Sequence, residues 1–159
     1  METVRLHEPA FDELTFRQEL LADPATMSYN HAWGGTISFT RERWAGWYDR
    51  WVARPEGKRF YRYVVNESGT YVGEIAFHID ETTGRYLADV LIAAGYRGRG
   101  YGGQALDHLC AAAAEAGASV LYDDIAADNP AVGLFLRRGF EEESRTEEII
   151  ILKKKLKSE

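Results

Sequence analysis

The segment GYRGRGYGG, residues 95–103, contains five glycines and two arginines among its nine residues. It follows the apolar run Val90–Ala94 and precedes a stretch with helical periodicity that begins near Gln104. Glycines directly before a helix let an anion approach the first backbone N–H groups, which lie at the positive end of the helix dipole. We therefore predict an anion-binding turn at a strand-to-helix junction, with Arg97 and Arg99 as supplementary positive charge.

The sequence on the C-terminal side of this turn predicts helix, strand, helix and strand. A stripe at i, i+3, i+4 and i+7 favours a helix that ends at Gly117, formed by Leu106, Leu109, Cys110 and Ala113. A strand is expected over residues 119–125. A short helix then follows, capped by Asn129 and ended by Gly139, before a last strand in EEIIILKKKL, residues 147–156.

The sequence on the N-terminal side predicts helices first and then hairpin-linked strands. A short strand over residues 2–7 precedes a helix that ends near Asp23-Pro24, and Thr40 begins a second helix. Three stretches then alternate between turn signals, at residues 59–66, 70–80 and 85–93. This order predicts one α/β domain with a mixed sheet and helices on both faces.

Composition excludes several classes of function. The net charge of −6 argues against a nucleic-acid-binding protein, and no apolar run is long enough to span a membrane. The N-terminus lacks the apolar segment of a signal peptide. Cys110 is the only cysteine, and the four histidines lack metal-ligand spacing, so we expect no disulfide and no metal site. A reducing, cytoplasmic location fits these features.

The glycine segment must be compared with two other known anion-binding motifs. A P-loop is excluded because no GxxxxGK[ST] pattern occurs. Residues 98–103 read literally as GxGxxG, and Asp123 and Asp124 lie where a ribose-binding acid of a dinucleotide site belongs. However, only one crossover follows, which leaves no room for a second mononucleotide half. A dinucleotide-binding protein therefore stays as the weaker alternative.

A third interpretation covers more of the chain. Residues 97–102, RGRGYG, match the (Q/R)xxGx(G/A) element of the GNAT acyltransferase superfamily, which binds the pyrophosphate of acetyl-CoA. Residues 128–140, DNPAVGLFLRRGF, resemble the second cofactor element of that family. The resemblance implies acceptor-side helices in residues 1–57, a cofactor-binding core in residues 58–145, and a C-terminal strand and tail in residues 146–159. It also implies a mostly antiparallel sheet with one splayed parallel strand pair.

The resemblance assigns the cofactor site residue by residue. The pyrophosphate of acetyl-CoA would lie against the turn and helix start formed by Arg97, Gly98, Arg99, Gly100, Tyr101, Gly102 and Gly103. Main-chain groups near Ile92 would pair with the pantetheine arm, and an amide there could polarise the thioester carbonyl. Asn129 and the following helix, including Phe135, would flank the other side of the arm.

The implied reaction is direct transfer of the acetyl group to a primary amine, of a small molecule or a peptide. An alkyl amine has a pKa of roughly 10.4, so it needs a base to remove its proton. Asp89 is our first candidate, since it lies in the apolar strand LADVLIA. Glu74 is the second, and alternation places it with Ala76 and His78 on one face of its strand. Alternatively, Asp89 is not the base but an ordinary surface carboxylate that points to solvent or pairs with a neighbour.

Phe135 departs from the family pattern. Many members carry a tyrosine at this position, which protonates the leaving thiolate, and phenylalanine cannot do so. Tyr101, Tyr122 or solvent could replace it, or the chain could be a CoA-binding module with little turnover. We favour the enzyme and keep the module as an alternative.

The acceptor site is expected in the N-terminal third, chiefly in the loop YNHAWGG, residues 29–35. Tyr29, His31 and Trp33 are the candidate substrate-binding residues, on family analogy. The stripe of Trp44, Trp47 and Trp51 is more often a packing face than a ligand site. Were that face exposed, it would favour a homodimer.

Overall fold

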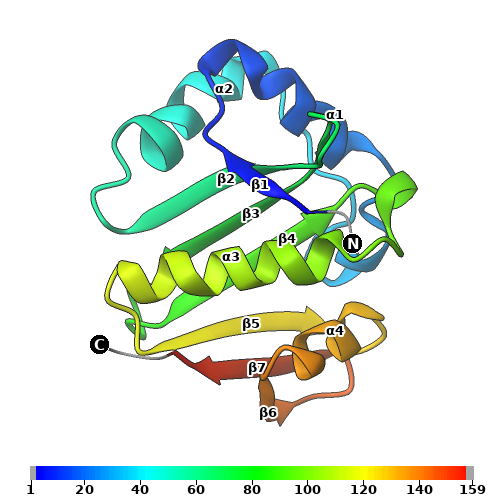
Figure 1. Cartoon of the computed structure of the whole chain (residues 1–159), viewed down its shortest axis with the longest axis vertical. Coiled ribbons are helices and arrows are strands. Elements are labelled where there is room, and N and C mark those ends of the chain that lie inside the picture. Colours follow the sequence, from blue (N-terminus) through cyan, green and yellow to red (C-terminus); the bar gives the residue numbers. More distant parts are fainter. Residues whose placement is uncertain (1–2, 157–159) are drawn as a thin grey trace.

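The chain forms one seven-stranded sheet with helices on both of its faces (Figure 1). The computed structural model describes residues 3–156. The strands are β1 (Arg5–His7), β2 (Arg59–Val65), β3 (Tyr71–Ile79), β4 (Tyr86–Ile92), β5 (Val120–Ala126), β6 (Glu141–Arg145) and β7 (Ile149–Lys155), in the order β1-β2-β3-β4-β5-β7-β6. The α-helices are α1 (Thr15–Ala22), α2 (Arg41–Tyr48), α3 (Tyr101–Glu115) and α4 (Ala131–Arg137), and the single-turn helical segments are η1 (Phe11–Leu14), η2 (Ser28–Trp33), η3 (Asp49–Ala53) and η4 (Ala94–Tyr96).

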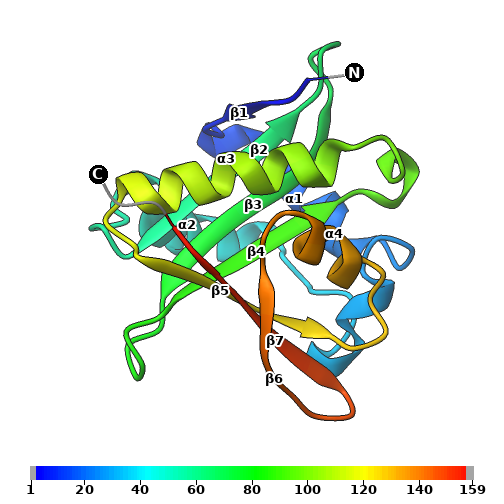
Figure 2. The same cartoon turned by 60° about the horizontal axis from the view of Figure 1, so that its bottom comes forward.

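The sheet is mostly antiparallel, as predicted, and its single parallel pair is short. β4 and β5 pair only at Tyr86 with Leu121 and at Leu87 with Tyr122. Beyond these residues the two strands diverge (Figure 2). We call this region, where β4 and β5 no longer pair, the β4–β5 fork.

β6 was not predicted from the sequence. Its five residues, EEESR, are all exposed and lack an alternating apolar pattern. The strand forms because its backbone pairs with β7 at the edge of the sheet, where Glu143 meets Arg85 at 2.9 Å. Tertiary pairing therefore decides this element rather than local propensity.

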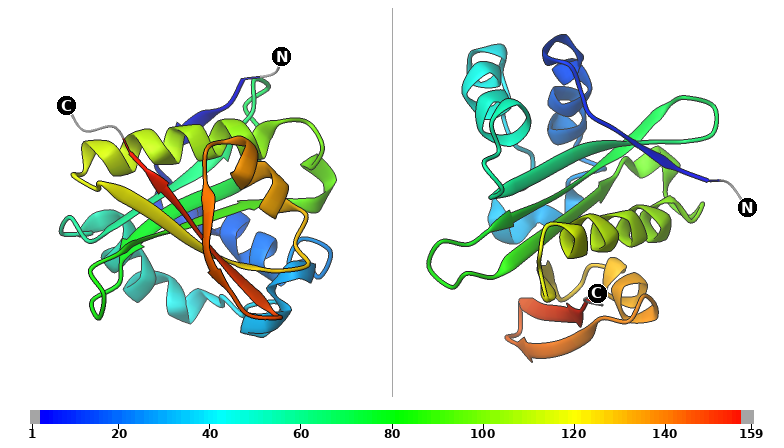
Figure 3. Two further views of the ribbon diagram at one scale, coloured as in Figure 1. Left: turned by 90° about the horizontal axis from the view of Figure 1, so that it is seen from below. Right: turned by 60° about the vertical axis from the view of Figure 1, so that its left-hand side comes forward.

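Two separate hydrophobic cores hold the helices against the sheet. α3 and α4 cover one face, where Ile75, Phe77, Leu106, Leu109 and Leu121 belong to the larger core. α1 and α2 cover the opposite face, over a core that includes Leu14, Leu21, Trp44, Trp47 and Tyr61 (Figure 3). Alternation along β3 and β4 therefore sends neighbouring side chains into different layers.

The Trp stripe belongs to the second core, so the packing interpretation is confirmed. Trp44 and Trp47 are 2% and 8% exposed, and Trp51 on η3 is half-buried. The stripe is therefore not an exposed apolar face, and the observation that would favour a homodimer is missing. None of the helices described in residues 3–156 has the length and apolar character needed to cross a bilayer.

Helix α3 begins at Tyr101, three residues before the start expected near Gln104. Gly102 and Gly103 lie inside its first turn, where a side chain would crowd Leu134 of α4 and displace the flexible end of Arg138. A Cβ on Gly102 would lie 3.1 Å from Leu134, and one on Gly103 would lie 2.4 Å from the guanidinium of Arg138. These two glycines thus permit close helix packing, whereas Gly98 and Gly100 adopt left-handed conformations, with φ of 80° and 85°.

A carboxylate network ties the N-terminal segment to the sheet. Glu13 accepts hydrogen bonds from Ala10 N at 2.7 Å and Tyr71 Oη at 2.7 Å, and its Oε1 lies 2.8 Å from His7 Nε2. These contacts, led by the backbone bond to Ala10, lower the pKa of Glu13 from 4.5 to about 2. The folded state therefore gains stability from the ionised form above about pH 4.5, and this gain is lost as the pH falls towards 2.

Replacing Glu13 by Gln should lower the free energy of unfolding at pH 7. The full pKa shift is discounted because the side chain is 32% exposed, which leaves about 1–2 kcal/mol. Urea unfolding at several pH values measures this, and the deficit should shrink below pH 4.5. Glu8→Gln is the control, because its exposed pair with Arg62 should contribute less than about 0.5 kcal/mol. Equal effects of the two substitutions would contradict the network.

Candidate active site

The glycine turn has the geometry of an anion site. Gly100 precedes the first residue of α3 in a left-handed conformation, and no side chain caps the helix. A Cβ on Gly95 or Gly98 would meet nothing within 4 Å, so the turn is open on its outer side. The first N–H groups of a 15-residue helix are thus left without a side-chain cap. The turn fits the pyrophosphate of a CoA thioester.

Arg97 is engaged differently from the prediction. Its Nε donates to Ile92 O at 3.0 Å and its Nη2 donates to Thr26 O at 2.7 Å. Thr26 Oγ1 in turn accepts a bond from Ala94 N at 3.0 Å. Arg97 therefore braces the glycine turn against the loop after α1. Arg99 is exposed and lies over the Tyr96 ring at 5.5 Å.

At the edge of β4, the backbone N–H and C=O groups of the even-numbered residues point towards the fork. Ala93 N donates to Val72 O at 2.9 Å, so Ala93 and every second residue before it bond towards β3. The N–H and C=O groups of Val90 and the N–H of Ile92 consequently point to the β5 side, while Ile92 O already accepts the bond from Arg97 Nε. Because β5 has already diverged, this stretch of strand edge can pair with an extended ligand.

In the second predicted cofactor element, the side chains of Asn129 and Phe135 make contacts within the protein. Asn129 Oδ1 accepts a bond from Ala131 N at 2.9 Å, which caps α4 as expected. Phe135 is 2% exposed and contacts Phe140 edge-on at 5.0 Å between ring centroids. Its ring therefore lies in the larger core and not at the fork.

The two tyrosines considered as replacement acids lie in different surroundings. Tyr101 is 1% exposed and packs in the larger core. Tyr122 is half-buried on β5, with the guanidinium of Arg85 at 4.2 Å from its ring centroid. Of these two, only Tyr122 offers a side chain that solvent reaches.

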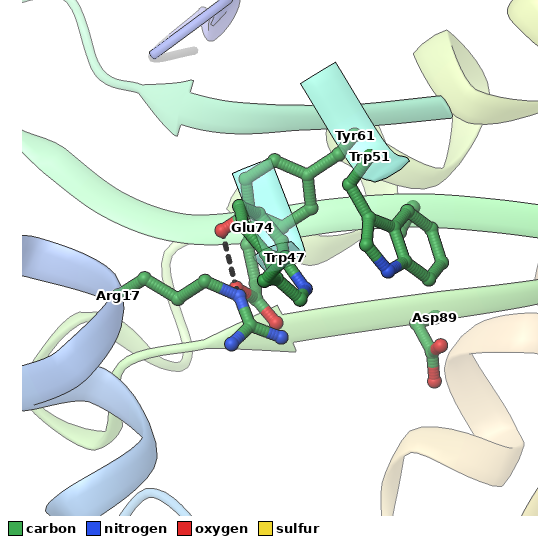
Figure 4. Close-up of a pocket in the computed structure, with 7 residues that line it drawn as sticks. Arg17, Trp47, Trp51, Tyr61, Glu74 and Asp89 are labelled. Carbon is green, nitrogen blue, oxygen red and sulfur yellow. Dashed lines mark hydrogen bonds and ion pairs between the residues drawn. The ribbon is translucent and has the colours of Figure 1, made fainter. Parts of the chain in front are cut away.

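A small cavity on the opposite face of the sheet from α3 brings the two predicted bases together. Its volume is about 50 Å³, and it is lined by Arg17, Trp47, Trp51, Tyr61, Glu74, Ala76 and Asp89 (Figure 4). We call it the Glu74–Asp89 cavity. The strand register explains the grouping, because Ala76 pairs with both Tyr61 and Asp89, and Glu74 is the next residue on the same face of β3.

Glu74 is held firmly in this cavity. Tyr61 Oη donates to Glu74 Oε1 at 2.5 Å, and Arg17 Nε lies 3.3 Å from the same oxygen. The Glu74 side chain is only 10% exposed. The guanidinium of Arg17 stacks against Trp47, with its carbon 4.3 Å from the ring centroid. Glu74 is therefore a paired and oriented carboxylate.

Asp89 is the less constrained carboxylate. Its side chain reaches solvent at the mouth of the cavity, although protein groups surround it. Desolvation, followed by the negative charge of Glu74, raises the pKa of Asp89 to about 7, against the opposing effect of Arg17. A carboxylate with this pKa can accept and release a proton near neutral pH.

Two further acids of β5 lie at the fork. Asp123 is 8% exposed, and burial together with Asp89 and Asp124 raises its pKa well above the usual range. Asp124 is exposed, and alternation along β5 sends its side chain to the opposite face from that of Asp123. The negative charge of Asp124 contributes to the raised pKa of Asp89. Of the two, Asp124 is the one whose negative charge acts on Asp89.

The predicted acceptor loop lies next to β5 and is separate from the cavity. Tyr29 and Trp33 are 36% and 48% exposed. His31 Nε2 lies 3.2 Å from both carboxylate oxygens of Asp128, the residue before Asn129. None of these three loop residues lines the Glu74–Asp89 cavity.

Sequence reasoning missed several residues of the cavity. Tyr61 was within reach, because the hairpin register that pairs Ala76 with Tyr61 and Asp89 follows from the turn signals between the strands. Trp47 and Trp51 were interpreted chiefly as packing residues, with a ligand site as the less frequent alternative. Arg17 gives no local signal, since only the packing of α1 on the sheet brings it to Glu74.

Comparison with known families decides the class of the protein. The family model described as the acetyltransferase (GNAT) family matches residues 17–140, which is more than half of the chain. The chain belongs to the GNAT acetyltransferase family. It is therefore an acetyl-CoA-dependent N-acetyltransferase, as the two motifs indicated.

Solved structures share the GNAT fold along nearly the whole chain. A proposed acetyltransferase from Acinetobacter baylyi ADP1 is 20% identical with a TM-score of 0.81, and the match covers 100% of this chain and 96% of that one. Spermidine N-acetyltransferase from Vibrio cholerae, in complex with CoA and spermine, is 17% identical with a TM-score of 0.78, over 95% and 94% of the two chains. The yncA protein from Salmonella typhimurium, with acetyl-CoA, is 18% identical with a TM-score of 0.77, over 100% and 96%.

The dinucleotide alternative does not fit this GNAT chain. A dinucleotide fold needs several parallel strands, whereas β4 and β5 form the one parallel pair of the described sheet.

The search for a metal site found no group of three potential metal ligands within residues 3–156.

Proposed function

We propose that this GNAT enzyme transfers the acetyl group of acetyl-CoA to a primary amine by direct attack in a ternary complex, with Asp89 as the general base. The observation that carries the proposal is the Glu74–Asp89 cavity, in which one paired and one freer carboxylate lie on β3 and β4 beside the fork. The aromatic walls from Trp47, Trp51 and Tyr61 suit the carbon skeleton of an amine.

The donor is proposed to lie along the fork. The turn from Gly98 to Gly103 would hold the pyrophosphate through backbone N–H groups, and the β4 edge at Val90 and Ile92 would hold the pantetheine arm. Bound there, acetyl-CoA supplies an acyl carbon activated as a thioester. An N–H of the same strand edge can donate to the thioester carbonyl, which is electrostatic stabilisation of the oxyanion type.

Asp89 is proposed to take a proton from the acceptor ammonium, either directly or through a water molecule. The freed nitrogen forms a bond to the acetyl carbon and loses its second proton to solvent, the C–S bond breaks, and the sulfur takes up a proton as CoA is released. A thiol titrates at roughly 8.5, so it leaves readily even without an acid at Phe135. Tyr122 or solvent supplies that proton.

The dependence of kcat/KM on pH should reveal Asp89. Because its ionised form is the base, and the Asp89 pKa is about 7, kcat/KM for an amine that is protonated at neutral pH should rise as the pH passes through 7. Replacing Glu74 by Gln removes a negative charge that raises this pKa, so the rise should move to lower pH. An acid limb at the same pH in both proteins would contradict this electrostatic coupling.

The function itself is tested by release of free CoA in the presence of a panel of amines. The panel should include alkyl amines, diamines, amino acids and peptides with a free N-terminus, with N-acetylated products identified by mass spectrometry. We expect turnover with at least one class. Binding of acetyl-CoA without turnover on any amine would instead support a CoA-binding module.

A further inference from the structure

We propose that the acceptor is an α-amino acid or a close analogue, whose carboxylate binds Arg17 while its ammonium group faces Asp89. This inference rests on the proposed amine acetylation and adds the substrate class. Among the groups that line the Glu74–Asp89 cavity, Arg17 is the one cation. Figure 4 shows Arg17 and Asp89 at opposite ends of the group that lines the cavity, with the Glu74 carboxylate beside Arg17.

Arg17 is held in place but has hydrogen-bonding capacity left. Its side chain is 15% exposed and stacks against Trp47 and Phe39, with the guanidinium carbon 4.3 and 4.5 Å from their ring centroids. Its buried Nε makes no hydrogen bond of ordinary geometry to the described residues, although Glu74 Oε1 lies 3.3 Å away. Because Nε faces Glu74, the terminal nitrogens of this stacked guanidinium are the donors left to bind a planar carboxylate.

The charges within the cavity favour a zwitterion over a polycation. Asp89 can receive an ammonium group. Glu74 pairs with Nε of Arg17, and a second ammonium group at that end would still meet the terminal guanidinium nitrogens. A carboxylate there satisfies Arg17 and does not compete for Asp89. A cavity of about 50 Å³ holds only a few heavy atoms, which favours an acceptor whose two charged groups are close together.

The direct test compares amino acids with their carboxamides on the native enzyme. Each pair has the same side chain, and the pairs should cover small, aliphatic, aromatic, polar and charged types. We expect kcat/KM for the acid to exceed that for the amide by at least about tenfold, the effect of one charge-assisted contact. The amine of the amide is less basic, so intrinsic reactivity at neutral pH favours the amide, and a preference for the acid must come from the protein. Equal rates within pairs, or faster acetylation of spermidine than of any amino acid, would overturn the proposal.

Variants of Arg17 then test whether this residue causes the preference for the acid over the amide. Arg17→Met keeps much of the packing on Trp47 but removes the charge, and should bring the acid-to-amide ratio close to one. Arg17→Lys should keep part of the preference. The control is Arg41→Met, which removes an exposed arginine stacked on Trp44 that does not line the cavity, and it should leave the ratio unchanged. A ratio that stays unchanged in a folded Arg17→Met protein would contradict the assignment.

Failure of this inference can be distinguished from failure of the proposed function. If spermidine or simple alkyl amines are acetylated but acids show no advantage, amine acetylation stands and the carboxylate site is wrong. If no amine is acetylated although acetyl-CoA raises the unfolding midpoint, the proposed function itself is wrong. The comparison on the native enzyme needs no variant, so it remains decisive even if Arg17→Met does not fold.

Discussion

Replacing Asp89 by Asn should lower kcat/KM for the acceptor by about 10²- to 10⁴-fold, the usual contribution of a general base. The amide has nearly the same shape but cannot take a proton at neutral pH. Asp89 is accessible to solvent and belongs to neither hydrophobic core, so folding and binding of acetyl-CoA should persist. Steady-state release of CoA at saturating acetyl-CoA measures the loss.

Asp124→Asn is the matched control for this substitution. It removes a neighbouring carboxylate that contributes to the raised pKa of Asp89, but it leaves the proposed base in place. At about pH 8, where Asp89 is ionised in either case, kcat/KM should stay within about threefold of the native value. If Asp89→Asn retained native activity, or if both variants lost activity equally, Asp89 would not be the base.

Replacing Gly100 by Val should abolish most of the stabilisation by acetyl-CoA. At roughly 100 times its dissociation constant, acetyl-CoA should add about 2.7 kcal/mol to the native protein. The introduced isopropyl group would stand at the start of α3, where a phosphate must approach the N–H groups. If affinity falls about a hundredfold, the gain at the same concentration drops to roughly 0.4 kcal/mol. Thermal unfolding with and without acetyl-CoA measures the difference.

Backbone strain must be separated from this loss of binding. Gly100 has a φ of 85°, and a Cβ there would meet only Gln104 Nε2 at 4.0 Å, so a β-branched residue strains the backbone while its Cβ has room. Gly84→Val introduces the same kind of strain in the β3–β4 turn, at a φ of 75° with open space around it. Both variants should lose about 1–3 kcal/mol of stability, and only Gly100→Val should lose the response to acetyl-CoA. An equal response in both would contradict a role for the turn in binding.

The sequence predicted those features of the fold that rest on local chemistry. Glycine before a helix, hairpin turns with alternating strands, and the cap at Asn129 each act within a few residues, so they can be recognised without coordinates. Edge strand β6 could not be predicted, because its charged residues carry no β pattern and only pairing with β7 makes them a strand.

The candidate site could be predicted in part for the same physical reason. Glu74 and Asp89 follow from alternation in strands that are easily located, and the register then brings them to one face. Arg17 could not be assigned, since it acts across a contact between α1 and β3. Arg97 fits the sequence motif, yet its hydrogen bonds to Ile92 and Thr26 are visible only in three dimensions.

The central claim is that donor and acceptor meet at the β4–β5 fork beside Asp89. A crystal structure of the enzyme with acetyl-CoA tests it most directly. We expect the pyrophosphate against residues 98–103, the pantetheine arm along the β4 edge at Val90 and Ile92, and the thioester next to the mouth of the Glu74–Asp89 cavity. A donor bound elsewhere, or a thioester with no open path to Asp89, would contradict the account.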